Sequence, residues 1–317
     1  MQRRTDDSED LYEVATWERR SALDAAASAI YRGIVLLLRL VVVLVAAAVL
    51  VALLGLAGFA SINDPVFGVF VVLSIVPALA LVAYVWHLDP TTKEKVGPMV
   101  ATFLLGILLA SFAAVGNSLL QPFFEAIPVV GTIVFFYLVV APIEETVKLL
   151  AVRLWAYEHA GFDAVVDGAV YGAIAGLGFA TIENVLYIGR QYLAAEAAGA
   201  GVIGQSVGTT VLRSLAGPGH VIYSAIAGYY LGLAKFNPRD AGPLVVKGLV
   251  IAALIHGTYN TLVGIVPALF DPALLAFLGF VIVYDGIFFY FLYRKLRRYR
   301  SVYESVGGRE AREEARG

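Results

Sequence analysis

The chain contains repeated apolar runs that are long enough to cross a lipid bilayer, and this feature limits its fold more than any other. A membrane-spanning helix needs about 20 consecutive, mostly apolar residues. Because backbone groups inside a bilayer must bond to one another, such runs are expected to be helices. Eight segments are predicted, at 34–58, 66–86, 97–118, 129–152, 166–189, 208–234, 245–267 and 272–293. The sequence therefore predicts an all-α, polytopic membrane bundle of about eight helices.

The composition agrees with a membrane protein and excludes several classes of function. Hydrophobic residues make up 60% of the chain and charged residues 15%, whereas soluble domains hold about 25% charged residues. The formal net charge is −2, so no basic excess indicates a nucleic-acid partner. The chain has no cysteine, which excludes disulfides and thiolate ligands and leaves any metal ion to histidines and carboxylates.

Lysine and arginine residues predict the orientation. They gather in the N-terminal tail, in alternate loops and at the C-terminal end, whereas the other loops hold few, with Arg190 as the clear exception. The positive-inside rule then places both termini in the cytoplasm of a multi-pass plasma-membrane protein. The predicted organisation is a charged tail at 1–33, the bundle at 34–293 and a second charged tail at 294–317. The first 20 residues carry both signs of charge, and no signal peptide is expected.

The fourth predicted segment carries three charged side chains, and ionisable residues inside membrane helices mark functional sites by default. Glu144 and Glu145 lie four and three residues before Lys148, which allows ion pairs along one helix. Pro142 cannot donate a hydrogen bond to the carbonyl of Leu138, so a kink and a polar notch are expected there. The alternative is a helix end whose charges reach the headgroups.

The fifth predicted segment combines a glycine stripe with a glutamate. Gly168, Gly172 and Gly176 are spaced by four residues, a pattern that favours close contact with another membrane helix. Glu183 follows on nearly the same face, so its side chain is expected to point toward protein rather than lipid. The alternative is a buried structural glutamate that pairs with a donor from a neighbouring helix.

The sixth and seventh predicted segments each place a polar side chain one turn after a histidine. Ser224 follows His220, and Asn260 follows His256, so each pair shares a helix face. Pro218, between two glycines, is expected to break or bend the helix before His220. Each histidine taken alone could be a hydrogen-bonded packing residue, and the combination across four segments favours a site.

Three expectations concern geometry. Counted at about 1.5 Å per residue from the nearest charged residue, the glutamates and histidines lie at depths that differ by about 10 Å, so helix tilt or a break must bring them together. The small residues at 194–206 are expected to form a loop. The polar groups are expected to line a water-accessible cavity that opens to the cytoplasm.

These residue types allow hydrolysis and also proton transfer. Carboxylates and imidazoles on neighbouring helices can bind a divalent metal ion such as zinc, and a further carboxylate can accept a proton from water that the ion acidifies. Asn260 could donate a hydrogen bond to a developing oxyanion. Glutamate and histidine could also activate water without a metal ion, and the same groups would suit a proton relay in a transporter.

Four motifs in order give the chain a family resemblance: "PIEETVK", "DGAVYGAIAGLGFATIEN", "GPGHVIYSAIAGYYLG" and "HGTYN". Over about residues 130 to 265 they resemble the PrsW family of intramembrane metalloproteases, which is related to the CAAX-processing prenyl proteases and bacteriocin-processing enzymes. The chain has Glu183 where prenyl proteases tend to carry histidine, which weakens the case for prenylated substrates.

The resemblance implies an intramembrane metal-dependent endopeptidase that cleaves a membrane-anchored protein or peptide, such as an anti-sigma-factor-like regulator. The implied catalytic residues are Glu144, Glu145 and Asn260, with one of the two glutamates as general base. The implied ligands of a divalent metal ion, expected to be zinc, are Glu144, Glu183, His220 and His256. Two alternatives stay open: a proton- or ion-coupled transporter that uses the cluster as a relay, and a non-catalytic membrane scaffold descended from such enzymes.

Overall fold

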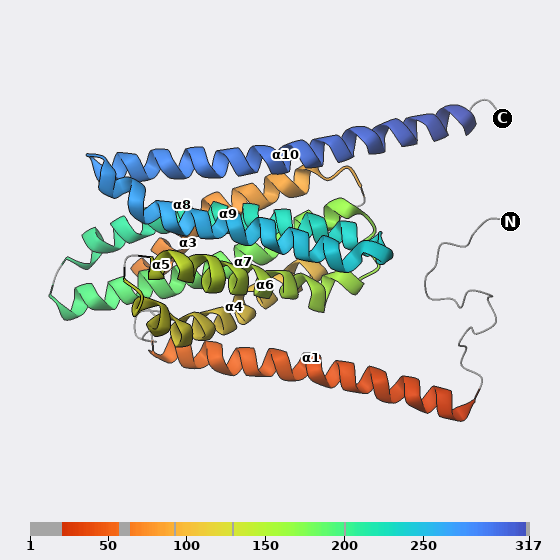
Figure 1. Cartoon of the computed structure of the whole chain (residues 1–317), viewed down its shortest axis with the longest axis horizontal. Helices are drawn as coiled ribbons and strands as arrows, with labels where there is room; N and C mark the ends of the chain where they lie inside the picture. Colours follow the sequence, from red (N-terminus) through yellow and green to blue (C-terminus); the bar gives the residue numbers. More distant parts are fainter. Residues whose placement is uncertain (1–20, 57–63, 92, 129, 200, 315–317) are drawn as a thin grey trace. The chain divides into compact units, whose positions relative to one another are not determined.

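All regular structure in the described part of the chain is helical, as predicted (Figure 1). A computed structural model describes residues 21–56, 64–91, 93–128, 130–199 and 201–314. Residues 1–20 of the predicted N-terminal tail and 315–317 of the C-terminal tail lie outside the described residues. The described part of the C-terminal tail continues the last helix to Glu314.

The long helices follow the predicted apolar segments. They are α1 (Ala22–Leu56), α3 (Pro65–Leu88), α4 (Val96–Glu125), α6 (Ala141–Leu154), α7 (Val165–Ala197), α8 (Val202–Lys235), α9 (Ala241–Leu269) and α10 (Ala273–Glu314). The short ones are α5 (Gly131–Phe135), the π-helical η1 (Phe136–Val140), and the 3₁₀ turns η2 (Ala156–Glu158) and η3 (Pro238–Asp240).

Six helical stretches in the described residues are long and apolar enough to cross a membrane, so the chain is a multi-pass membrane protein. They lie in α1, α3, α4, α7, α9 together with η3, and α10. The α5–η1–α6 stretch and α8 are not among the stretches that combine the length and the hydropathy needed to cross a membrane. The count of eight spans and the cytoplasmic position of the termini therefore stay predictions.

The chain divides within α1 into two compact units, Met1–Val45 and Ala46–Gly317. In the described part of the first unit, α1 begins with reciprocal hydrogen bonds: the Ser21 backbone N–H donates to Asp24 Oδ2 over 2.9 Å, and the Asp24 N–H donates to Ser21 Oγ over 3.1 Å. Such bonds satisfy backbone donors that a helix start leaves free. The second unit contains every candidate site residue.

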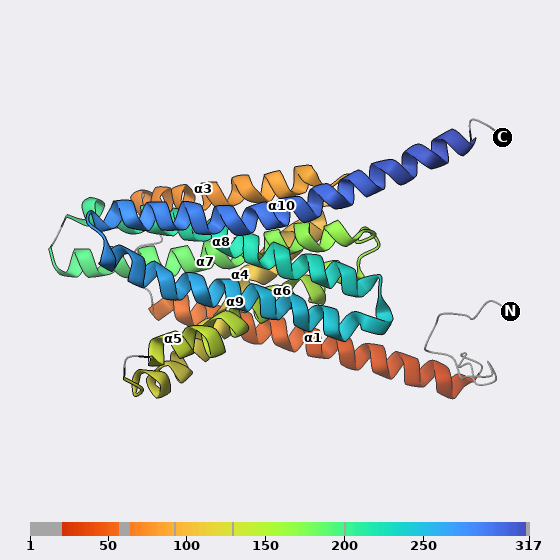
Figure 2. The same ribbon diagram turned by 45° about the horizontal axis from the view of Figure 1, so that its top comes forward.

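Helix α7 is the centre of the second unit (Figures 1 and 2). It packs against α3, α4, α6 and α8. In its most apolar 18-residue window 89% of the residues are buried, compared with 11% to 33% in the other five candidate spans. Because α7 is surrounded by other helices, its polar side chains face protein neighbours along most of its length.

The glycine stripe of α7 brings α7 and α8 into backbone contact, as predicted. A Cβ atom added to Gly168, Gly172 or Gly176 would overlap the carbonyl oxygen of Gly228, Ser224 or His220, respectively. Small residues permit such close approach in membrane helices. The stripe therefore sets the position of His220 and Ser224 relative to α7.

Replacing Gly172 with Ala is expected to destabilise the bundle. The added Cβ would overlap backbone atoms of α8, which cannot rotate away, and overpacking of this kind costs about 1–3 kcal/mol. The melting temperature in detergent should fall by several degrees. Gly264→Ala in α9 is the matched control, because no atom lies within 4 Å of its added Cβ; equal melting of the two variants would contradict the contact.

The stretch before the tandem glutamates is irregular, as Pro142 predicts. Residues of η1 form a π-helical turn, and the Ala141 N–H donates to the Phe136 carbonyl, five residues earlier. Because proline lacks an N–H, the register ahead of it can widen without losing a further hydrogen bond. Such π-turns are frequent at functional sites.

The structure differs from two sequence expectations about local structure. Of the expected break or bend at Pro218, the break is absent, since helix α8 runs on through Pro218; membrane helices tolerate proline where neighbouring helices cover the freed carbonyl. The predicted loop at 194–206 is mostly helical, since α7 continues to Ala197 and α8 begins at Val202. Alanines extend the helix, and the chain turns at Gly199, whose φ of +62° suits glycine.

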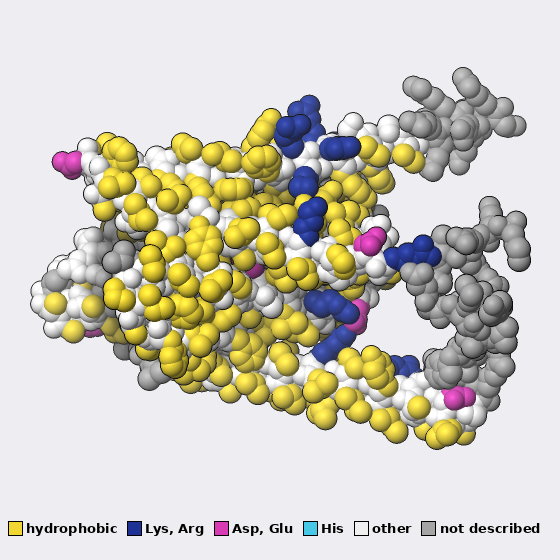
Figure 3. Space-filling model, viewed as in Figure 1, with side chains coloured by type: hydrophobic (Ala, Val, Ile, Leu, Met, Phe, Trp, Pro, Cys, Tyr) yellow, Lys and Arg dark blue, Asp and Glu magenta, His cyan; other side chains and the backbone are white. Residues whose placement is uncertain are grey.

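Lysine and arginine side chains of the second unit gather toward the end of the bundle where α8 is followed by α9 (Figure 3). The α3–α4 and α6–α7 connections lie at the same end (Figures 1 and 2). The positive-inside rule predicts this end to be cytoplasmic. The α7–α8 and α9–α10 connections lie at the opposite end.

Candidate active site

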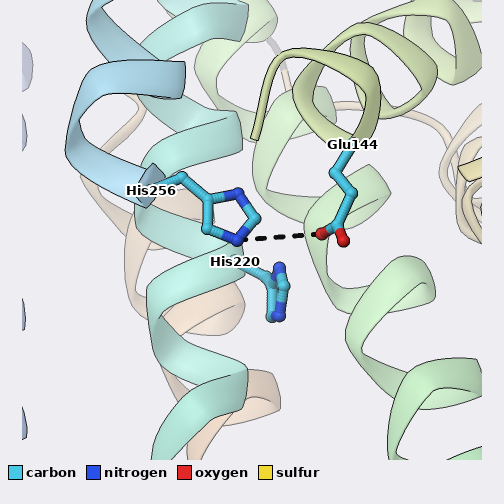
Figure 4. A group of neighbouring side chains, drawn as sticks. All are labelled: Glu144, His220 and His256. Carbon is cyan, nitrogen blue, oxygen red and sulfur yellow. Dashed lines mark ion pairs between the residues drawn. The ribbon is translucent and has the colours of Figure 1, made fainter. Parts of the chain in front are cut away.

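Three predicted site residues from three helices converge inside the bundle (Figure 4). Glu144 comes from α6, His220 from α8 and His256 from α9, and one ligand atom of each lies within 4.8 Å of the others. All three side chains are buried. Glu144 Oε2 lies 3.7 Å from His256 Nε2. The 10 Å difference in depth expected from the sequence is therefore absent.

Glu145 lies next to this group, away from the cavity described below, and orients His256. His256 Nδ1 lies 2.9 Å from Glu145 Oε1, which leaves Nε2 directed toward Glu144. Ser224 Oγ donates to the other carboxylate oxygen of Glu145 over 3.3 Å. Only 1% of Glu145 is exposed. A carboxylate that holds one nitrogen of an imidazole fixes the ring and its tautomer for binding through the other nitrogen.

Lys148 supplies a positive charge to the buried carboxylates. Its Nζ donates to Glu145 Oε1 over 2.7 Å, lies 2.9 Å from His220 Nδ1, and lies 3.8 Å from Glu144 Oε2. The ammonium also lies 4.3 Å from the centre of the Phe179 ring, a favourable cation–π position. Lys148 thus compensates charge inside the bundle, and the predicted alternative of headgroup contact is wrong for this segment.

Glu183 lies beside the three-residue group rather than within it. Its Oε2 lies 2.9 Å from His220 Nε2 and accepts a hydrogen bond from Arg213 Nη2. Arg213 Nε donates to Asn184 over 2.8 Å. Glu183 therefore points toward protein, as predicted, and holds His220 much as Glu145 holds His256.

A cavity of about 970 Å³ reaches the group, and Asn260 lies in its wall together with Glu144, Glu183, His220 and His256. Aromatic side chains of Phe124, Phe135, Phe136, Tyr187 and Phe277 form much of the remaining wall. Glu145 and Lys148 do not line it. Glu144 is thus the member of the tandem pair that faces the cavity.

The exposed part of the cavity wall lies toward the α7–α8 end of the bundle. Its exposed lining residues include Gln121 and Glu125 near the end of α4, and Arg190 in the last part of α7. These residues lie far along their helices from the basic connections. The glutamates and histidines are therefore reached from the α7–α8 end. The positive-inside rule predicts the other end to be cytoplasmic, so the expectations of a cytoplasmic opening and of cytoplasmic basic loops do not hold together.

Sequence reasoning missed three polar partners of the site. Arg213 lies at the edge of a predicted segment, and its role as partner of Glu183 has no local signal. Asn117 Nδ2 donates to Glu144 Oε1 over 3.2 Å. Asp285 in α10 accepts a 2.7 Å hydrogen bond from Tyr223, whose ring lies 5.6 Å from that of His256. An aspartate inside an apolar segment is itself a signal that could have identified Asp285.

The three-residue group fits a divalent metal ion. Two imidazoles and one carboxylate are the donor set of several catalytic zinc sites, which keep a further position open. Glu144 Oε2 is buried without a hydrogen-bond partner among the described residues, as expected of an oxygen reserved for a cation. Lys148 has to withdraw from His220 Nδ1 before that nitrogen can bind an ion.

Comparison with known proteins agrees with the motifs. Residues 94–287 match the sequence model described as PrsW family intramembrane metalloprotease. Protease PrsW of Bacillus subtilis (strain 168) is 30% identical over 231 residues, which covers 72% of this chain and 94% of that protein. Protease PrsW of Geobacillus kaustophilus (strain HTA426) is 30% identical over 196 residues, covering 59% and 76% of the two chains. No solved structure has significant similarity to the chain.

Proposed function

This chain belongs to the PrsW family of intramembrane metalloproteases, and from that membership we propose that it hydrolyses a peptide bond in a membrane-anchored protein with the help of a divalent metal ion. The convergence of Glu144, His220 and His256 on one buried point beside a cavity carries the proposal. The three residues come from three different helices, so their proximity does not result from helical spacing within one segment.

The proposed ion is zinc, held by Glu144, His220 and His256. A divalent ion there would supply Lewis acidity and lower the pKa of water. Glu145 and Glu183 act as positioning residues, because each bonds to one nitrogen of a histidine and directs the ring. Glu183 is thus proposed next to the ligand set rather than in it.

The remaining roles follow from the cavity wall. Asn260 lies there one turn after His256, where its side-chain N–H can donate to a substrate carbonyl oxygen as negative charge develops on it. Glu144 carries an unbonded oxygen at the cavity and can serve as ion ligand or as acceptor of a proton from water. The metal content of a variant that lacks the Glu144 carboxylate distinguishes the two roles. Loss of the metal ion would indicate a ligand, and retention would indicate a proton acceptor.

The proposed substrate is a membrane-anchored regulator of the anti-sigma-factor class, cleaved at the membrane face remote from the basic loops. The aromatic wall suits an apolar stretch of peptide, and the exposed mouth lies at the α7–α8 end. If the basic loops are cytoplasmic, as the positive-inside rule predicts, this mouth faces the other side of the plasma membrane.

Metal analysis of the purified protein tests the proposal without knowledge of the substrate. The intact protein in detergent is expected to retain about one equivalent of zinc, and His256→Ala to lose most of it, because the variant removes a ligand. Glu196→Gln, an exposed carboxylate outside the cavity, is the matched control. Equal metal content in the intact protein and His256→Ala would refute the ligand assignment.

A further inference from the structure

A second group of carboxylates lies apart from the candidate active site, where the α3–α4 linker meets the start of α7. Asp89 and Glu94 belong to the linker, and Asp167 belongs to the first turn of α7. One carboxylate oxygen of each lies within 4.8 Å of the others. Each of the three residues is at most 5% exposed. Three acidic side chains thus share one small buried volume.

Three of the six carboxylate oxygens lack a donor among the described residues, whereas Asp167 Oδ1 accepts from the Thr91 hydroxyl over 3.5 Å. Both carboxylate oxygens of Glu94, and Oδ2 of Asp89, are buried without a hydrogen-bond partner among the described residues. Other oxygens of Asp89 and Asp167 do have donors. Asp89 Oδ1 accepts from the Thr91 backbone N–H over 2.8 Å and from its hydroxyl over 2.7 Å. Asp167 Oδ2 accepts from the backbone N–H groups of Asp163 and Ala164 over 2.7 and 2.8 Å.

The nearby lysines act on the group through space, but the hydrogen bonds that they donate among the described residues go to backbone carbonyls and not to its carboxylates. Lys93 Nζ donates to the backbone carbonyls of Trp86 and Asp89, over 2.6 and 2.7 Å. Lys235 Nζ likewise donates to two backbone carbonyls beyond α6. Burial raises the pKa of Glu94 to about 7, and the charges of Asp89 and Asp167 add to the increase. Buried carboxylates without a directly bonded counter-ion are costly, and a bound cation would supply one.

We infer that Asp89, Glu94 and Asp167 form a binding site for a hard divalent cation, Ca²⁺ or Mg²⁺, that ties the α3–α4 linker to the start of α7. The donor set consists of oxygen alone, which both ions prefer and which distinguishes this site from the nitrogen-containing group around His220. The site does not depend on the proposed peptidase function. It fixes the end of the central helix that lies far from the cavity mouth.

Thermal melting of the full-length protein in detergent tests the inference. Relative to chelator, saturating Ca²⁺ or Mg²⁺ is expected to raise the melting temperature of the intact protein by about 5 °C. Glu94→Gln is expected to abolish this increase and, in chelator, to melt no lower than the intact protein, because it removes an unpartnered buried charge. Glu196→Gln should respond as the intact protein does.

Terbium luminescence gives a second readout that does not depend on stability. Trp86 lies three residues before Asp89 and Tyr171 four residues after Asp167, so both can sensitise a bound Tb³⁺ ion. Emission should appear in the intact protein, decrease on addition of Ca²⁺, and be lost in Glu94→Gln and in Asp89→Asn.

Two outcomes would overturn the inference. The first is an intact protein whose melting temperature and Tb³⁺ emission do not respond to Ca²⁺ or Mg²⁺, which would indicate a shared proton instead of a cation. The second is loss of the response in His256→Ala, which would assign the cation to the candidate active site. Retention of the response in His256→Ala supports the separate site, even if that variant has lost its zinc.

Discussion

Replacing Glu144 with Gln is expected to reduce cleavage of a membrane-anchored substrate by at least about 100-fold. The substitution keeps the size of the side chain and the acceptor for Asn117, but it removes the negative charge that faces His256 and the cavity. Cleavage can be followed by co-expression with single-span membrane proteins and by N-terminal sequencing of the products. Glu196→Gln should cleave at the rate of the intact protein.

Glu145→Gln separates positioning from direct participation. Because Glu145 is absent from the cavity wall and holds His256, its loss is expected to weaken metal binding by about 10–100-fold, and excess zinc should restore part of the activity. Glu144→Gln should not recover with zinc. Glu144→Gln protein that keeps its metal would identify Glu144 as the proton acceptor, and protein without metal would identify it as a ligand. Full activity of Glu144→Gln would refute both roles.

Replacing Arg213 with Met is expected to cost about 3 kcal/mol of stability, because Glu183 then keeps a largely buried charge without its partner. The two side chains are 14% and 20% exposed, so solvent can screen the loss only in part. The melting temperature in detergent should fall by roughly 5–10 °C.

A double variant and a surface pair provide the controls for this prediction. Glu183→Gln combined with Arg213→Met should recover much of the stability, since no unpaired charge is left. Arg153→Met breaks an ion pair with Glu158 whose side chains are nearly half exposed, and such pairs contribute at most about 1 kcal/mol. An equal decrease for Arg153→Met and Arg213→Met would contradict the importance of burial.

The helical architecture and the close contact of α7 with another helix were predictable because both depend on local patterns; that the partner is α8 was not. Apolar run length decides which segments can cross a bilayer, and glycines every four residues on one face allow backbones to touch. The wrong depth estimate has a physical cause. Helices α7 and α8 have 33 and 34 residues, about 50 Å, so the charged residues from which depth was counted do not mark the membrane boundary.

The residues of the site could be predicted from the sequence, but which of them contact one another could not. Glu144, Glu183, His220 and His256 stand out because ionisable groups are rare in apolar segments. Which of them share a point depends on the rotation of each helix, and sequence spacing says nothing about rotation between helices. For the same reason the bond between Arg213 and Glu183, 30 residues apart, could not be predicted.

The glycine contacts between α7 and α8 also limit how a substrate can enter. Where carbonyl oxygens of one helix rest directly against glycines of the other, neither helix can slide or turn without collision, so the pair that carries Glu183 and His220 should behave as one stiff wall. Admission of a polypeptide would then depend on displacement of the other walls, which include the α5–η1–α6 stretch with its widened turn.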